Sequence, residues 1–94
     1  AINDMYAFGV YAGARDLGLK VPDDVSVTGV DDITLTEVVE PPLTTVQQPL
    51  RDITRLAVER LINRLHDTRS HPPGHQTLPP KLIVRKSTAR YQKS

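Results

Sequence analysis

The chain lacks cysteine, which excludes a disulfide framework and any zinc or redox chemistry based on thiolates. It also lacks tryptophan and has one phenylalanine, so large side chains for closing a hydrophobic core are scarce. No apolar run approaches the ~18 residues of a membrane-spanning helix, and the first residues do not have the pattern of a signal peptide. With 94 residues, the chain is one small domain at most, or part of a larger one. We therefore expect a cytoplasmic chain without membrane contact that is too small to act alone.

The formal net charge is only +1, but the two halves of the chain differ in sign. Residues 1–47 carry eight acidic and two basic side chains, whereas residues 48–94 carry three acidic and ten basic ones. A basic half can indicate nucleic-acid binding. Here the bases are spread over an expected helix, loop and strand, without interleaved aromatic rings or a helix-turn-helix or zinc pattern. We interpret them as a solvated helix face and a basic tail.

Helical and extended patterns alternate along the chain. Asn3 or Asp4 is expected to cap a helix that ends at Gly18, where glycine suits the left-handed position after a helix. Pro49 is expected in the first turn of a second helix, whose apolar face carries Leu50, Ile53, Ala57, Leu61 and Leu65. Three segments have the composition of strands: residues 25–30, 43–46 and 82–84. A helical turn is expected over 33–39, a proline-rich loop over 67–80 and a polar tail over 85–94.

This alternation predicts an α/β architecture with a mainly parallel sheet. The first two residues are expected to end a further strand. Parallel strands are normally covered by helices on both faces, and two helices are too few for that. We therefore expect the chain to be the end of a larger α/β protein.

Acidic and amide side chains follow two of the expected strands. Asp31 and Asp32 come directly after residues 25–30, and Asn3 and Asp4 follow the strand end at the start of the chain. Ligands of open α/β sheets bind beyond the carboxyl ends of the strands, so these side chains are expected to line one edge. An amide that donates and accepts, beside a carboxylate that accepts from two hydroxyls, suits a polyhydroxylated ligand such as a sugar or nucleoside. The candidate binding residues are Asn3 and Asp31.

Two other interpretations of these residues remain open. Asp4 capping the helix and Asp32 capping the next turn would give both side chains a purely structural role. Adjacent carboxylates can also hold Mg²⁺, although neither a phosphate loop nor a third acidic motif supports a metal site. We predict no metal and no cofactor, and the histidines are interpreted as solvated loop residues: His66, His71 and His75. Because no hydroxyl has a partnered base, we also predict that the chain is not an enzyme.

Three apolar side chains could serve a partner subunit. Phe8, Val38 and Val39 form an apolar patch if the sheet does not cover the helix face that carries Phe8. Burial within the same chain is the alternative.

Several motifs in register resemble the late effector domain of LacI/GalR-family bacterial transcription regulators. They are Asn3-Asp4-x-x-Ala7, then Gly18-Leu19-x-Val21-Pro22-x-Asp24-Val25-Ser26-Val27-x-Gly29-x-Asp31-Asp32, then Pro41-Pro42-Leu43-Thr44-Thr45-Val46-x-Gln48-Pro49, and finally Leu82-x-Val84-Arg85-x-Ser87-Thr88. The resemblance covers about residues 1–88 and implies part of a periplasmic-binding-protein-like (type I) two-lobed fold. It assigns residues 1–47 and about 78–94 to the C-terminal lobe and about 48–77 to the N-terminal lobe.

The resemblance also implies a function. A small-molecule effector, such as a sugar or related metabolite, would bind between the lobes of a homodimer and alter operator binding. Operator DNA would be bound only through an N-terminal headpiece that these residues do not contain. Effector contacts map onto Asn3 and Asp31, and the dimer surface maps onto the helix of Phe8 and the segment of Val38 and Val39. Val30 departs from the family, which often has an aromatic residue there. A periplasmic-type sugar-binding protein, which shares the fold, is the alternative function.

Overall fold

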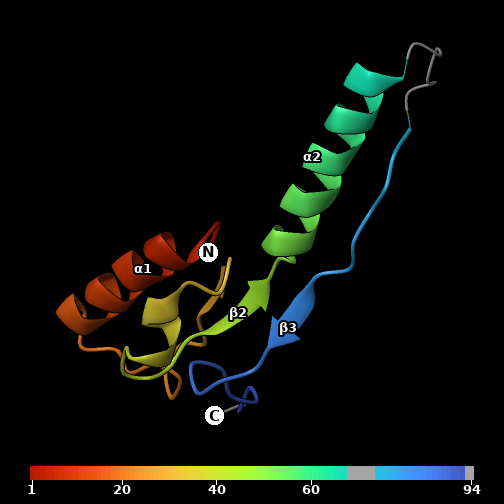
Figure 1. Ribbon diagram of the computed structural model, residues 1–94. Helices are drawn as coiled ribbons and strands as arrows, with labels where there is room; N and C mark the ends of the chain where they lie inside the picture. The colour runs from red at the N-terminus through yellow and green to blue at the C-terminus, as the bar shows by residue number, and fades with distance from the viewer. Residues whose placement is uncertain (68–73, 93–94) are drawn as a thin grey trace. The chain divides into compact units, whose positions relative to one another are not determined.

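The computed structural model describes residues 1–67 and 74–92 (Figure 1). Its elements are, in chain order, helix α1 (Asp4–Asp16), strand β1 (Thr28–Val30), the 3₁₀ helix η1 (Thr34–Glu37), strand β2 (Thr44–Gln47), helix α2 (Leu50–His66) and strand β3 (Lys81–Ile83). The chain divides into two compact units, Ala1–Gln48 together with Lys81–Ser94, and Pro49–Pro80. The candidate binding residues all belong to the first unit.

Helix α1 begins and ends where the sequence predicts. The side chain of Asn3 caps its N-terminus by accepting a hydrogen bond from the backbone nitrogen of Tyr6 at 2.9 Å. At the other end Gly18 has a φ of 72°, and the nitrogens of Gly18 and Leu19 donate to the carbonyls of Arg15 and Ala14. This is the Schellman arrangement, in which a left-handed residue lets the chain satisfy the last carbonyls of a helix.

The sheet of the first unit has the order β1-β2-β3 and is mixed. β1 and β2 are parallel, as expected, with Thr28 opposite Thr44. β2 and β3 are antiparallel, which the prediction of a mainly parallel sheet did not anticipate. The register gives the reason, since Gln47 at the end of β2 pairs with Lys81 at the start of β3. The chain leaves the unit at the end of β2 and re-enters it beside that point, so β3 must run in the opposite direction.

The segment after β3 is not the polar tail that the sequence suggested. Ser87 is fully buried; its hydroxyl donates to the carbonyl of Val27 at 2.6 Å and accepts from the nitrogen of Thr44 at 2.8 Å. The backbone nitrogen of Val27 in turn donates to the carbonyl of Ser87, and that of Ala89 to the hydroxyl of Ser26. Because residues 26 and 27 are bonded to this segment, the strand predicted over 25–30 is confined to Thr28–Val30.

The core of this unit is small and depends on close contact between α1 and the sheet. Ala7, Val27 and Leu43 form its buried cluster. A Cβ atom at Gly29 would overlap Oδ1 of Asp4 and would lie 3.1 Å from the Cα of Asp4. Only glycine therefore allows the first turn of α1 to lie this close to β1.

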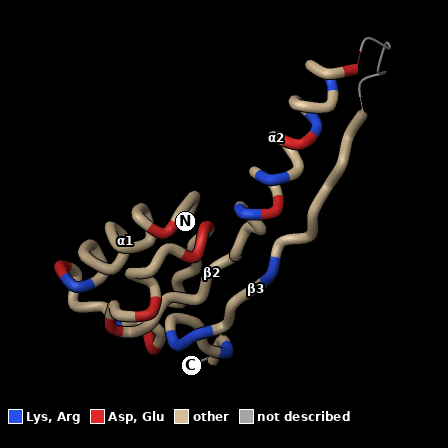
Figure 2. The backbone as a smooth tube through the Cα atoms, in the orientation of Figure 1, with Lys and Arg blue, Asp and Glu red and all other residues tan. Residues whose placement is uncertain are grey.

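Helix α2 carries the predicted apolar repeat but buries none of its residues within the described chain. The exposed fractions of Leu61 and Leu65, on its apolar face, are 59% and 74%. Figure 2 shows acidic positions interspersed with the basic ones along the backbone of this helix, so the basic half of the sequence is not uniformly positive here. No helix among the described residues is both long and apolar enough to cross a membrane.

Candidate functional site

Asn3 stands at the N-terminus of α1 and is half-buried. The nitrogen of Ala1 donates to the carbonyl of Thr28 at 2.7 Å, so the segment leading to Asn3 lies beside β1. The Oδ1 atom of Asn3 is used in capping the helix. Its Nδ2 group has no hydrogen-bond partner among residues 1–67 and 74–92, which leaves two N–H donors for a ligand.

Asp4 has a role that sequence reasoning missed. The sequence allows it to cap the helix, but Asn3 is the cap and Asp4 is buried, with an exposed fraction of 1%. Its Oδ1 accepts from the hydroxyl of Thr45 at 2.6 Å and its Oδ2 from the backbone nitrogen of Ile33 at 2.9 Å. The carboxylate therefore links α1, β2 and the loop after β1, and burial excludes it from ligand contact.

Asp31 follows β1 directly and is half-buried. Its backbone nitrogen donates to the carbonyl of Val46 at 2.8 Å, and its Oδ1 accepts from Nε2 of Gln48 at 3.0 Å. Within the described ranges Oδ2 accepts no hydrogen bond. Asp31 thus offers a carboxylate that is anchored through one oxygen and can accept from a ligand hydroxyl through the other.

Asp32 is turned toward the protein rather than toward a ligand. Its carboxylate accepts from Nη2 of Arg85 at 2.7 Å, from the hydroxyl of Thr36 at 3.1 Å and from Nε2 of Gln47 at 2.8 Å. The sequence allows Asp32 to cap the next helical turn, but the cap residue of η1 is Ile33, which makes no side-chain capping bond.

Burial acts to raise the pKa of Asp32, but the hydrogen bonds from Arg85, Gln47 and Thr36 and the charge of Arg85 outweigh it and lower the pKa below 3.8. The contribution of this carboxylate to stability is therefore present above its ordinary pKa and is lost as the pH falls through the lowered value.

Arg85 is the site residue that the sequence did not single out. It follows β3, and its side chain is only 13% exposed. Besides Asp32, it contacts the hydroxyl of Thr36 at 2.8 Å and the carbonyl of Leu43 at 2.9 Å through Nη1. The signal available in the sequence is its place in the motif Leu82-x-Val84-Arg85-x-Ser87-Thr88, which does not show which side chains Arg85 contacts.

The structure brings the two predicted binding segments together. The bond between Asp4 and Ile33 joins the residue after Asn3 to the loop that carries Asp31, at the carboxyl end of β1. In the described part of the chain, no three His, Cys, Asp or Glu residues are grouped so as to hold a metal ion. His66 and His75 are exposed, and His71 lies outside the described residues. The geometry therefore offers donors and acceptors for hydroxyl groups.

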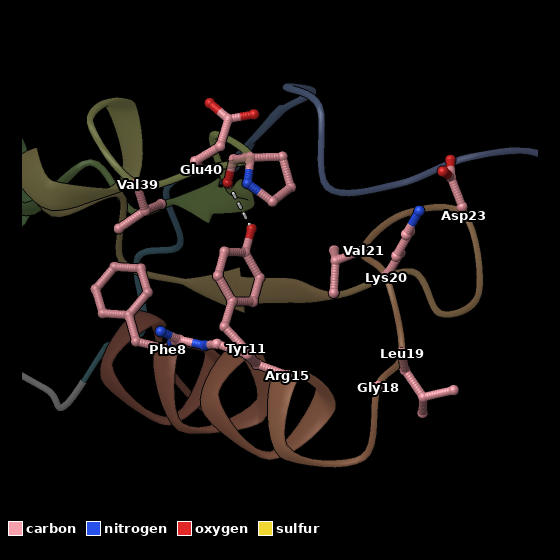
Figure 3. Close-up of a pocket in the computed structure, with 11 residues that line it drawn as sticks. Phe8, Tyr11, Arg15, Gly18, Leu19, Lys20, Val21, Asp23, Val39 and Glu40 are labelled. Carbon is pink, nitrogen blue, oxygen red and sulfur yellow. Dashed lines mark hydrogen bonds between the residues drawn. The ribbon is translucent and has the colours of Figure 1, made fainter.

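The residues predicted for a dimer surface have different surroundings. Phe8 and Val39 are partly buried and pack against the core, whereas Val38 is 71% exposed. Phe8 and Val39 also line an open groove of about 860 Å³ beside α1 (Figure 3). In this groove the ring of Tyr11 lies edge-on to Phe8, with centroids 6.3 Å apart, and its hydroxyl donates to the carbonyl of Pro41 at 2.8 Å. Intrachain packing thus accounts for two of the three side chains, and Val38 remains available to a partner.

Comparison with known proteins gives consistent results. The family model described as a periplasmic binding protein-like domain matches residues 1–88. The chain is 44% identical over 87 residues to the HTH-type transcriptional regulator MalR of Streptomyces coelicolor, covering 93% of this chain and 25% of MalR. It therefore spans about a quarter of the length of the curated relatives that it matches.

Solved structures show the same similarity. A LacI family transcriptional regulator from Enterococcus faecium with bound ribose has a TM-score of 0.84 and 34% identity, over 95% of this chain and 33% of that one. A LacI family regulator from Arthrobacter sp. FB24 in complex with lactose has a TM-score of 0.78 and 39% identity, over 95% and 33% of the two chains.

Proposed function

Since this chain belongs to the periplasmic binding protein-like domain family, in the form found in LacI-family regulators, we propose that it is the effector-binding and dimerisation part of a bacterial transcription regulator. The regulator senses a small metabolite, a sugar, and alters its binding to operator DNA in the cytoplasm. Operator DNA is contacted by a headpiece outside these residues. The chain itself has no catalytic role.

The observation that carries this proposal is the state of the Asp31 carboxylate. One oxygen is anchored by Gln48 and the other has no partner among the described residues, at a sheet edge that also carries the unpaired amide of Asn3. Neighbouring hydroxyls of a sugar can donate to such a carboxylate oxygen and accept from such an amide. The ribose and lactose bound to similar regulators support a sugar as the ligand class.

We further propose that the chain contributes to two lobes. Residues 1–47 and about 78–94 belong to the C-terminal lobe and about 48–77 to the N-terminal lobe. The division into compact units at Gln48 and Lys81 supports this assignment, as does the exposed apolar face of α2, which needs cover from further polypeptide. An effector that binds the two lobe orientations unequally shifts their populations. The two connections between the lobes, near residues 46–49 and 78–81, serve as hinges.

A titration of the full-length regulator on its operator tests the function. We expect ribose, lactose or another pentose, hexose or disaccharide to change operator affinity, as measured by fluorescence anisotropy of labelled duplex DNA. Calorimetry with the same sugars is the direct binding measurement. A regulator that binds operator but none of the sugars would contradict the proposed ligand. A full-length chain that binds a sugar but no duplex DNA would instead support the periplasmic-type sugar-binding protein.

The dimer surface is tested by a charge at Val38. We expect Val38→Asp to convert the full-length dimer to monomer at micromolar concentration in analytical ultracentrifugation, because a buried interfacial carboxylate without a partner is costly. Val84→Asp is the matched control, since Val84 is also exposed, at 69%. Unchanged sedimentation of the Val38 variant would exclude this surface as the interface.

A further inference from the structure

The backbone that carries Asp31 has an unusual conformation. Asp31 has a φ of 120° and the next residue, Asp32, a φ of 61°. Side chains with a Cβ atom rarely adopt positive φ, and two such residues in succession persist only where surrounding contacts hold them. The contacts of this loop therefore determine where the free oxygen of Asp31 points.

The strongest of these contacts come from Arg85. Its guanidinium binds a stretch of chain that is distant from it in sequence, since it donates to Asp32 after β1, to Thr36 in η1 and to the carbonyl of Leu43 before β2. The side chains of Arg85 and Asp32 are only 13% and 12% exposed, so solvent screens this ion pair weakly. The planar fork of arginine suits such a set of acceptors, and a lysine nitrogen cannot reproduce it.

We propose that Arg85 is a positioning residue for the effector site, which holds Asp32 in place and thereby fixes the backbone that presents Asp31 to the ligand. The proposal rests on the proposed function of Asp31. Arg85 acts through Asp32 and not by touching the effector, because both of its terminal nitrogens are already bonded to protein oxygens.

The charges around the ion pair of Arg85 and Asp32 show why Asp32 depends on Arg85. Asp31 and the buried Asp4 lie in or against the same loop and add negative charge. Glu37 approaches Arg85 at 3.8 Å but is 70% exposed, so its contribution is small. In the described residues Arg85 is the one Lys or Arg paired with Asp32. Without it, the Asp32 carboxylate keeps only the neutral donors Gln47 and Thr36 and is expected to turn to solvent, moving the loop.

Hydrogen exchange of the full-length regulator tests this directly. We expect Arg85→Gln to accelerate amide exchange in residues 31–36 at least tenfold, with α1 unchanged, and Arg85→Lys to have a smaller effect. Arg85→Gln combined with Asp32→Asn is expected to recover part of the protection, because a neutral amide needs no counter-charge. Arg90→Gln is the control, as Arg90 is an exposed arginine in the same segment.

The outcomes separate a positioning role from a merely structural one. Unchanged exchange in residues 31–36, or equal acceleration in α1 and the loop, would overturn the proposal. If Arg85→Gln does not fold, exchange in residues 31–36 is compared with exchange in α1 for Arg85→Lys, where the expected acceleration is smaller. Ribose is the binding probe. Its dissociation constant is expected to be at least tenfold higher for the Arg85→Gln variant than for the unmodified regulator. If the unmodified regulator does not bind ribose, the choice of ligand fails, and the exchange data still decide the role of Arg85.

Discussion

Replacing Asp31 by asparagine in the full-length regulator is expected to shift the effector titration to sugar concentrations about 10- to 100-fold higher. A hydrogen bond to a charged group contributes about 1.5–3 kcal/mol, which corresponds to this range. The neutral amide has the same shape as the carboxylate but has no ionised oxygen to accept a ligand hydroxyl at the position of Oδ2. Operator affinity without sugar should stay the same, since the headpiece that binds DNA is not part of this site.

The measurement is the change in the regulator's affinity for labelled operator DNA as sugar is added. Asp16→Asn is the matched control, because Asp16 is an exposed aspartate at the end of α1. The control should give the titration curve of the unmodified protein. A coincident curve for the Asp31 variant would mean that Asp31 does not contact the effector.

Replacing Asp4 by alanine is expected to reduce the stability of the full-length regulator. The variant loses two hydrogen bonds of a buried carboxylate and leaves the hydroxyl of Thr45 and the backbone nitrogen of Ile33 without a partner. Each bond to a charged group contributes about 1.5–3 kcal/mol, so we expect a loss of about 3–6 kcal/mol for the two. The thermal midpoint of the full-length protein should fall by roughly 10 °C.

Differential scanning calorimetry measures this effect. Asp4→Asn keeps the shape and one acceptor oxygen, so its midpoint should lie between those of Asp4→Ala and the unmodified protein. Asp16→Ala, on the exposed side of the same helix, should melt normally. Equal midpoints for Asp4→Ala and Asp16→Ala would show that the buried link contributes nothing.

Elements with local signals were predicted well. α1 was predicted because Asn3 and Gly18 satisfy the backbone groups at its two ends, and each acts within a few residues of the helix. α2 was predicted from its apolar repeat, which is also local. The strand over 25–30 was predicted too long, because the bonds of Val27 to Ser87, 60 residues away, are not visible in a local pattern.

The amino-acid sequence by itself determined the two helices, the positions of the strands to within a few residues, the candidates Asn3 and Asp31, and the resemblance to a family. Only the tertiary structure decided how the neighbouring acidic side chains are used. Asp4 turns inward to Thr45, 41 residues away, and Asp32 pairs with Arg85, 53 residues away. The physical reason is that a carboxylate becomes structural or ligand-binding according to which donors the fold brings to it, and these donors come from distant segments.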